Sequence, residues 1–209
     1  MSCLKDIWIV SQTQIHRWVA VGLGMKIKIE PETEGDYEQI KTLHTLAFNG
    51  DNEARLVEKL RRTPVYVREL SLVARCRNTV IGHILFYPVR ISSCGKKFVS
   101  LALAPVSVIP GFQNRKVGSR LVTEGLDKAR KLGFKSVIVV GHSEYYPRFG
   151  FEKASKYGIS TPFAVPDDSV FAIELAKDGL KGCTGIVEYP AEYNEVSRVP
   201  VERSDTNAL

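Results

Sequence analysis

The stretch that decides the fold is Gln113-Asn-Arg-Lys-Val-Gly-Ser119, which stands between an apolar strand-like run and a helical pattern. Gly133 ends that pattern, and residues 135–141 (Lys-Ser-Val-Ile-Val-Val-Gly) are typical of a strand buried on both faces. The order strand, turn, helix, strand predicts an α/β unit. Small and apolar residues share one face of the predicted helix: Gly118, Leu121, Val122, Gly125, Leu126, Ala129 and Leu132.

Outward from this unit, the sequence pattern predicts the other elements of a mixed α/β domain. Upstream, it predicts a strand at 26–30, a helix from Thr33 or Asp36 to about Phe48, a second helix at 52–62, and three antiparallel strands at 69–77, 80–91 and 98–108. Downstream, it predicts a short helix at 145–149, a strand around Phe151 and a strand at 169–175. The chain contains no internal repeat, so these elements are predicted to form one domain.

The composition of the 209 residues, 44% hydrophobic and 25% charged, is that of one soluble globular domain and excludes disordered and collagen-like chains. No stretch approaches the roughly 20 consecutive apolar residues of a membrane-spanning helix, so we expect no membrane partner. The 29 basic and 23 acidic side chains give a net charge of +6, which favours an anionic partner.

The cysteines and histidines are scattered along the chain and form no spacing typical of a metal site or a disulfide framework. We therefore expect no metal, and a reducing cytoplasm is the expected location. The residues in question are Cys3, Cys76, Cys94, Cys183, His16, His44, His83 and His142.

The predicted domain covers residues 25–190. Residues 1–24 fit neither a signal peptide nor the domain pattern, because Gln12, Gln14 and Arg17 interrupt their apolar run. They are predicted to be an N-terminal extension outside the fold. Residues 191–209 are predicted to be a polar C-terminal tail, since they show no periodicity.

The loop before the predicted helix has the chemistry of an anion site. The first amides of a helix have no intrahelical acceptor and lie at the positive end of its dipole, so residues 115–119 form a candidate cradle for a pyrophosphate. Gly118 would keep the approach to these amides open. A glycine in the first turn serves close contact between helix and sheet equally well, so both roles stay open.

The strand before this loop contains a proline, within Ala104-Pro-Val-Ser-Val108. Proline removes a ladder donor and is confined to bulges and edges, so the sheet is interrupted there. If strands 98–108 and 135–141 are neighbours that splay apart, the free backbone groups of residues 106–108 can pair with an amide-bearing ligand. A simple edge strand is the alternative.

Two motifs resemble those of a known family. Residues 103–118 (Leu-Ala-Pro-Val-Ser-Val-Ile-Pro-Gly-Phe-Gln-Asn-Arg-Lys-Val-Gly) and 141–151 (Gly-His-Ser-Glu-Tyr-Tyr-Pro-Arg-Phe-Gly-Phe) are similar to the GNAT superfamily of acetyl-CoA-dependent N-acetyltransferases. The second motif particularly resembles a prokaryotic branch that carries Gly-His-x-x-Tyr-Tyr-Pro-Arg-Phe-Gly-Phe. The resemblance covers about residues 25–189. It implies an α/β (α+β) fold with a mostly antiparallel central sheet, helices on both faces and a splayed strand pair that forms the CoA cleft.

The resemblance also implies where the co-substrate acetyl-CoA binds. Lys116 stands where the family has the first loop glycine, and a lysine there needs a backbone conformation that a Cβ atom tolerates. Its ammonium can also attract a phosphate. The implied pantetheine-binding residues are Val106, Ser107 and Val108, and the implied pyrophosphate-binding residues are Gln113, Asn114, Arg115, Lys116, Val117, Gly118 and Ser119.

Tyr146, four residues before Gly150, matches the tyrosine that the family places near the thioester sulfur. Aminolysis of a thioester expels a thiolate, and a phenol with a pKa of about 10 can pass its proton to a sulfur whose thiol has a pKa of about 8.5. Tyr146 is therefore the predicted general acid. Two alternatives stay open: Tyr146 fills the core beside Phe149 and Phe151, or Tyr145 takes the catalytic role.

The sequence does not identify the general base that takes a proton from the acceptor amine. Residues 98–110 contain no Asp or Glu, which closes the route that many family members use. His142, Glu144 and His83 are candidates that could act through water, although His83 on a central strand also fits a structural core histidine. Arg148 is expected to make a structural or phosphate-facing contact.

The predicted function is the direct transfer of an acetyl group from acetyl-CoA to a primary amine of a small molecule or peptide. No acyl-enzyme is expected, because Cys76, Cys94 and Cys183 have no base in a shared motif. The alternative is a non-catalytic acyl-CoA sensor or interaction module. Nucleic-acid binding is disfavoured, because the basic residues near the loop have no aromatic stacking platform and suffice to meet the phosphates of CoA. The sequence does not decide whether the protein forms a homodimer.

Overall fold

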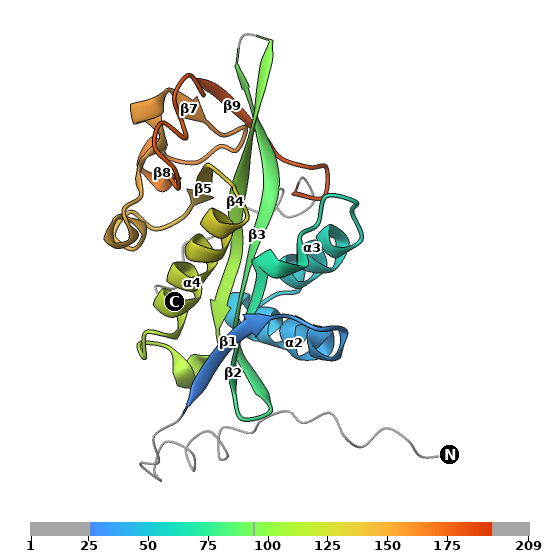
Figure 1. Ribbon diagram of the computed structural model, residues 1–209. Coiled ribbons are helices and arrows are strands. Elements are labelled where there is room, and N and C mark those ends of the chain that lie inside the picture. Colours follow the sequence, from blue (N-terminus) through green and yellow to red (C-terminus); the bar gives the residue numbers. More distant parts are fainter. Residues whose placement is uncertain (1–25, 94, 194–209) are drawn as a thin grey trace.

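The computed structural model describes residues 26–93 and 95–193, which form one sheet and the helices that cover it (Figure 1). The described strands follow the order β1-β2-β3-β4-β5-β8-β6, with β9 paired to β3 and β7 to β9. The pairs β4–β5 and β7–β9 are parallel and the others antiparallel, which confirms the predicted mostly antiparallel sheet. The strands are β1 (Ile27–Pro31), β2 (Ser71–Cys76), β3 (Thr79–Ser93), β4 (Lys96–Val108), β5 (Ser136–Val140), β6 (Glu152–Lys153), β7 (Ile159–Ser160), β8 (Val170–Glu174) and β9 (Gly185–Glu188).

Helices cover both faces of the sheet, as the resemblance implied. The helices α2 (Tyr37–Phe48) and α3 (Asn52–Arg61) lie on one side of β3 and β4, and α4 (Val117–Lys131) lies on the other (Figure 1). Short 3-10 helices occupy several connections: η1 (Glu34–Asp36), η2 (Arg68–Leu70), η3 (Pro110–Phe112), η4 (Tyr146–Phe149), η5 (Ala154–Tyr157) and η6 (Asp167–Ser169).

The predicted apolar face of α4 packs on the sheet. Leu121, Val122 and Ala129 are fully buried, whereas Leu132, just beyond the last turn, is exposed. A Cβ atom at Gly125 would lie 2.1 Å from Phe86 Cε2 of β3. The glycine therefore lets the helix approach the strand closely enough to cover that ring.

The strands β4 and β5 separate after a short contact. They pair only at Leu101 with Val137 and at Ala102 with Ile138, while β4 continues to Val108. The register between β3 and β4 shifts at the proline. Ile84 pairs with Val106 and Phe86 with Leu103, so one residue of β3 lies opposite two residues of β4, at 104 and 105. Of the alternatives that the sequence left open, the structure therefore has a bulge at the proline, and β4 and β5 are neighbours that separate.

The part of the chain after β5 differs most from expectation. The predicted short helix at 145–149 is the 3-10 helix η4, and the sequence pattern did not predict the short strands β7 and β9. Tyr193 is buried and packs on Tyr189, with ring centroids 5.0 Å apart. The predicted N-terminal extension and residues 194–209 lie outside the described residues. No helix within 26–193 has the length and apolar character needed to cross a membrane.

Candidate active site

The loop that enters α4 keeps the backbone shape of a glycine turn. Lys116 has φ 62° and ψ 14°, the left-handed conformation, and Asn114 has φ 59°. For a residue with a Cβ atom this conformation costs roughly 1–2 kcal/mol. The turn therefore forms although Lys116 stands where the motif that it resembles has a glycine, and the helix starts immediately after it.

The start of α4 presents unpaired amides. The first hydrogen bond of the helix runs from the Arg120 amide to the Lys116 carbonyl oxygen (3.0 Å), so the amides of residues 117–119 precede the helical ladder. They lie at the positive end of the helix dipole. Asn114 and Arg115 are exposed beside them. This arrangement has the chemistry to hold an anion such as a pyrophosphate.

Gln113 attaches the loop to the strand that precedes it. Its side-chain amide donates to the Val108 carbonyl oxygen (3.3 Å). The Arg115 guanidinium lies 5.9 Å from the centroid of the Phe112 ring. Both contacts shape the loop, and the predicted contacts of these two side chains with acetyl-CoA stay predictions.

The space left by the missing side chain of Gly118 is used by a tyrosine. A Cβ atom at Gly118 would lie 3.1 Å from the Tyr145 hydroxyl oxygen and 3.7 Å from Val108 Cγ2. Gly118 therefore serves close packing at the start of the helix, which is one of the two roles that the sequence left open. Burial raises the pKa of the Tyr145 phenol.

Tyr146 is buried among aromatic rings. The rings of Tyr145, Phe151 and Phe171 have their centroids 5.2, 5.6 and 6.2 Å from that of Tyr146. A Cβ atom at Gly141 would lie 2.4 Å from Tyr146 Cε2, so the ring lies directly against the end of β5. Burial raises the pKa of the Tyr146 phenol, and the neighbouring Tyr145 adds to this effect. Tyr146 thus fills the core and also keeps its proton at neutral pH.

Substitution of Gly141 by alanine should displace the ring of Tyr146, the predicted general acid, and lower the turnover of acetyl-CoA by about tenfold or more, because misplacement of a group that acts in the reaction is costly. The Cβ contact of 2.4 Å leaves the ring no room in its present position. Steady-state assays of released thiol measure the effect. Gly35→Ala is the matched control, since its Cβ atom would meet only Thr33 Oγ1 at 3.8 Å. Equal turnover in both variants would contradict the predicted role of Tyr146 as general acid.

Arg148 has structural partners. Its guanidinium lies 4.7 Å above the centroid of the Tyr145 ring, and its Nη2 donates to the Glu144 carbonyl oxygen (3.3 Å). His142 and Glu144 are exposed in the turn that follows β5. The two candidate bases therefore lie at the surface, close in sequence to Tyr146.

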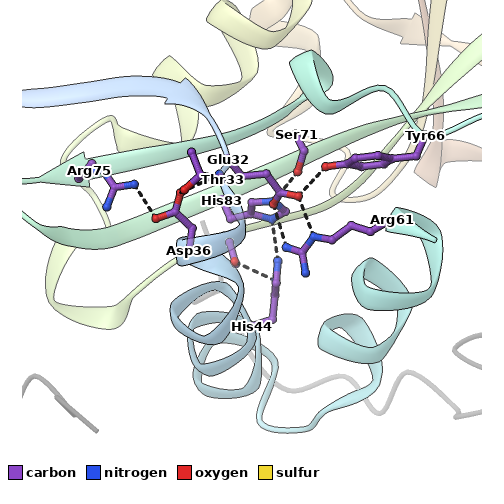
Figure 2. A network of polar contacts seen from close by, with 10 residues as sticks. Glu32, Thr33, Asp36, His44, Arg61, Tyr66, Ser71, Arg75 and His83 are labelled. Carbon is purple, nitrogen blue, oxygen red and sulfur yellow. Dashed lines mark hydrogen bonds and ion pairs between the residues drawn. The ribbon is translucent and has the colours of Figure 1, made fainter. Parts of the chain in front are cut away.

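A buried carboxylate, Glu32, lies between the sheet and the helices α2 and α3 (Figure 2). Arg61 donates to both of its oxygens at 2.7 and 2.8 Å, and the Tyr66 hydroxyl donates at 2.5 Å. Burial alone would raise the pKa of Glu32, but hydrogen bonds from His83 and Arg61 outweigh it and hold the pKa well below its usual range. Glu32 is therefore ionised.

Two buried histidines extend this cluster to β4. His83 Nε2 lies 3.2 Å from Glu32 Oε2 and 2.9 Å from Ser71 Oγ. His83 Nδ1 lies 2.8 Å from His44 Nε2, and His44 Nδ1 lies 3.0 Å from Ser107 Oγ. Burial lowers the pKa values of both histidines. His83 is thus the structural core histidine that the sequence left open, with both ring nitrogens bonded inside the protein.

The sequence singled out His83 and Ser107 separately. It did not predict that His44 lies between them or that His83 contacts Glu32. These residues come from four different elements or connections, and only the fold brings them together. A signal was present at His44, which follows Leu43 on the buried face of α2. A polar residue at a core position of a helix indicates a buried hydrogen-bonding partner.

The fold and the comparison of sequences define the class of protein together. Residues 28–154 match the family described as "Acetyltransferase (GNAT) domain", which covers more than half of the chain. The chain therefore belongs to the GNAT acetyltransferases, and the predicted enzyme class is confirmed. In the described part of the chain, no three His, Cys, Asp or Glu side chains are grouped so that they could hold a metal ion.

Two proteins of Escherichia coli strain K12 that are similar to this chain are named as N-acetyltransferases. The chain is 36% identical over 136 residues to the "Uncharacterized N-acetyltransferase YjhQ", which covers 65% of this chain and 75% of the relative. It is 32% identical over 167 residues to the "Uncharacterized N-acetyltransferase YhbS", which covers 79% of this chain and 98% of the relative.

Solved structures of the family show the same fold. Escherichia coli YhbS in complex with CoA gives a TM-score of 0.76 at 31% identity, over 81% of this chain and 93% of that one. A GNAT family acetyltransferase of Brucella melitensis in complex with acetyl-CoA gives 0.66 at 29% identity, over 81% and 99% of the two chains.

Proposed function

We propose that this protein transfers an acetyl group from acetyl-CoA directly to a primary amine of a small molecule or peptide. The observation that carries the proposal is the separation of β4 from β5 beside the free amides at the start of α4. The structures of YhbS with CoA and of the Brucella melitensis relative with acetyl-CoA support the same ligand here. A non-catalytic acyl-CoA sensor would bind the ligand but would not turn it over.

In the proposed complex, the two parts of acetyl-CoA are bound by different segments. The amides of residues 117–119 donate to the pyrophosphate, and the exposed Arg115 and Lys116 add positive charge. The backbone of Val106 and Val108 pairs with the pantetheine arm, since β5 does not occupy this part of β4. The thioester then lies between β4 and the end of β5, next to Tyr146.

The reaction needs a proton for the leaving sulfur. The acceptor amine attacks the thioester carbon, and the carbon–sulfur bond breaks as the amide forms. Tyr146 donates its hydrogen bond and proton to the departing thiolate, and solvent later restores the proton. A phenol is protonated at neutral pH, and burial raises the pKa of Tyr146 further, so the proton is present before each turnover. His142 and Glu144 are the candidates that take the proton of the amine through water.

Thermal unfolding with acetyl-CoA tests the proposed site without knowledge of the acceptor. A ligand at about 100 times its dissociation constant adds about 2.7 kcal/mol to the free energy of unfolding. For a domain of this size, the midpoint should rise by roughly 5–10 °C. CoA should give a similar rise and adenosine a much smaller one, because adenosine has neither the pyrophosphate nor the pantetheine arm.

A screen of amines, read out as free thiol, then separates the enzyme from the sensor. Release of CoA that depends on a primary amine would support acetyl transfer. Binding without turnover for any amine would favour the sensor. No rise in the midpoint at millimolar acetyl-CoA would overturn the proposed site.

A further inference from the structure

The end of β4 is attached to the sheet on one side only. Its pairing with β5 stops at Ala102, and residues 106–108 pair with β3, where Ser107 faces His83. The Ser107 side chain makes a further contact with α2, since its Oγ lies 3.0 Å from His44 Nδ1. The helix therefore holds the strand segment that the proposed pantetheine arm would use.

The charge of Glu32 sets the direction of the hydrogen bonds that lead to this contact. An ionised carboxylate only accepts, so we assign the proton of His83 to Nε2, where Glu32 Oε2 (3.2 Å) and Ser71 Oγ (2.9 Å) both act as acceptors. His83 Nδ1 then accepts from His44 Nε2 (2.8 Å), and His44 Nδ1 accepts from the Ser107 hydroxyl (3.0 Å). Each bond fixes the tautomer of the next ring, and Ser107 is the donor at the end of the chain.

We propose that the chain Ser107–His44–His83–Glu32 positions residues 106–108 of β4 to pair with the pantetheine arm of acetyl-CoA. This inference rests on the proposed function. Glu32, His83 and His44 are positioning residues, because they act on the ligand only through Ser107 and its strand. The buried cluster on the α2 side of the sheet thereby contributes to affinity for a ligand that binds along the edge of β4.

Removal of the Ser107 hydroxyl tests this role. In Ser107→Ala, His44 Nδ1 loses its donor in a fully buried site, and the end of β4 loses its side-chain hydrogen bond to α2. The dissociation constant of CoA should rise about tenfold, while that of adenosine 3′,5′-bisphosphate should change by less than about twofold. The second probe has no pantetheine arm. Isothermal titration of the full chain with both probes measures the difference.

Ser100 supplies a matched control on the same strand. Its hydroxyl lies 2.8 Å from that of Ser136, and both residues are buried. Ser100→Ala therefore removes one buried hydroxyl contact of β4 outside the proposed chain. It should bind both probes as the wild-type protein does.

A double variant shows whether Ser107 acts through His44. Ser107→Ala combined with His44→Gln should bind CoA no more weakly than the weaker of the two single variants, because both remove the same contact. Equal weakening of the two probes by Ser107→Ala would show a general effect on the fold and overturn the inference, as would unchanged CoA binding. Failure of the wild-type protein to bind CoA would instead overturn the proposed function.

Discussion

Turnover should fall about 100-fold when Tyr146 is replaced by phenylalanine, while the dissociation constant of acetyl-CoA stays within about twofold of the wild-type value. The phenylalanine ring can keep the packing against Phe151 and Phe171. Only the proton donor to the departing sulfur is removed. Release of free thiol with an acceptor from the amine screen gives kcat and KM, and a binding titration gives the affinity for acetyl-CoA.

The control for this substitution is Tyr37→Phe, which also removes one phenol hydroxyl. Tyr37 lies at the start of α2, where its ring contacts the Arg61 guanidinium at 4.1 Å from the centroid. Its replacement should leave turnover at the wild-type level. Unchanged turnover in Tyr146→Phe would refute the role of general acid. A loss of acetyl-CoA affinity as large as the loss of turnover would assign Tyr146 to binding instead.

The largest effect on stability is expected from Glu32→Gln. The substitution removes the charge that pairs with Arg61 and accepts from Tyr66 and His83, all in a buried site. Loss of one partner of a buried ion pair costs about 3 kcal/mol or more, because the remaining charge is left uncompensated. The midpoint of thermal unfolding should fall by roughly 6–12 °C. Thermal and urea unfolding followed by circular dichroism measure both quantities.

Glu58→Gln is the control for the loss of a carboxylate that pairs with an arginine. Glu58 contacts Arg62 at 2.6 Å, but both side chains are largely exposed. Water screens such a pair, so its loss should leave the midpoint close to that of the wild-type protein. A similar, small change in both variants would mean that the cluster around Glu32 contributes little to stability.

The sequence predicted the elements that local rules determine. The turn at 77–79 joins β2 and β3 as predicted, and Gly133, with φ 85°, ends the helix pattern of α4. Alternation and helical periodicity are local properties, so β1 to β5 and the helices α2, α3 and α4 lie close to their expected bounds. The proline at 105 likewise indicated a bulge or an edge, because proline has no amide proton to donate to a sheet, and the structure has the bulge.

The remaining features depend on contacts between distant positions. The role of Gly118 could not be decided from the sequence, because it depends on a contact with the Tyr145 hydroxyl. Tyr145 lies in the turn after β5, far from Gly118 in the sequence. The link between Glu32 and Ser107 through two histidines was missed for the same reason. The short strand β9 pairs with β3 at residues 90–92 and with β7, and both partners lie far from it in the sequence. Such partners are fixed by tertiary structure and leave little local signal.

The left-handed turn at Lys116 matters for how proteins of this kind are detected. The loop adopts φ 62° at a lysine and 59° at Asn114, so the path of the backbone does not require glycine at either position. A search motif that demands glycine at position 116 would discard this chain, although its helix starts with the same kind of free amides. A signature that admits asparagine and lysine there would describe the turn itself and recover such sequences.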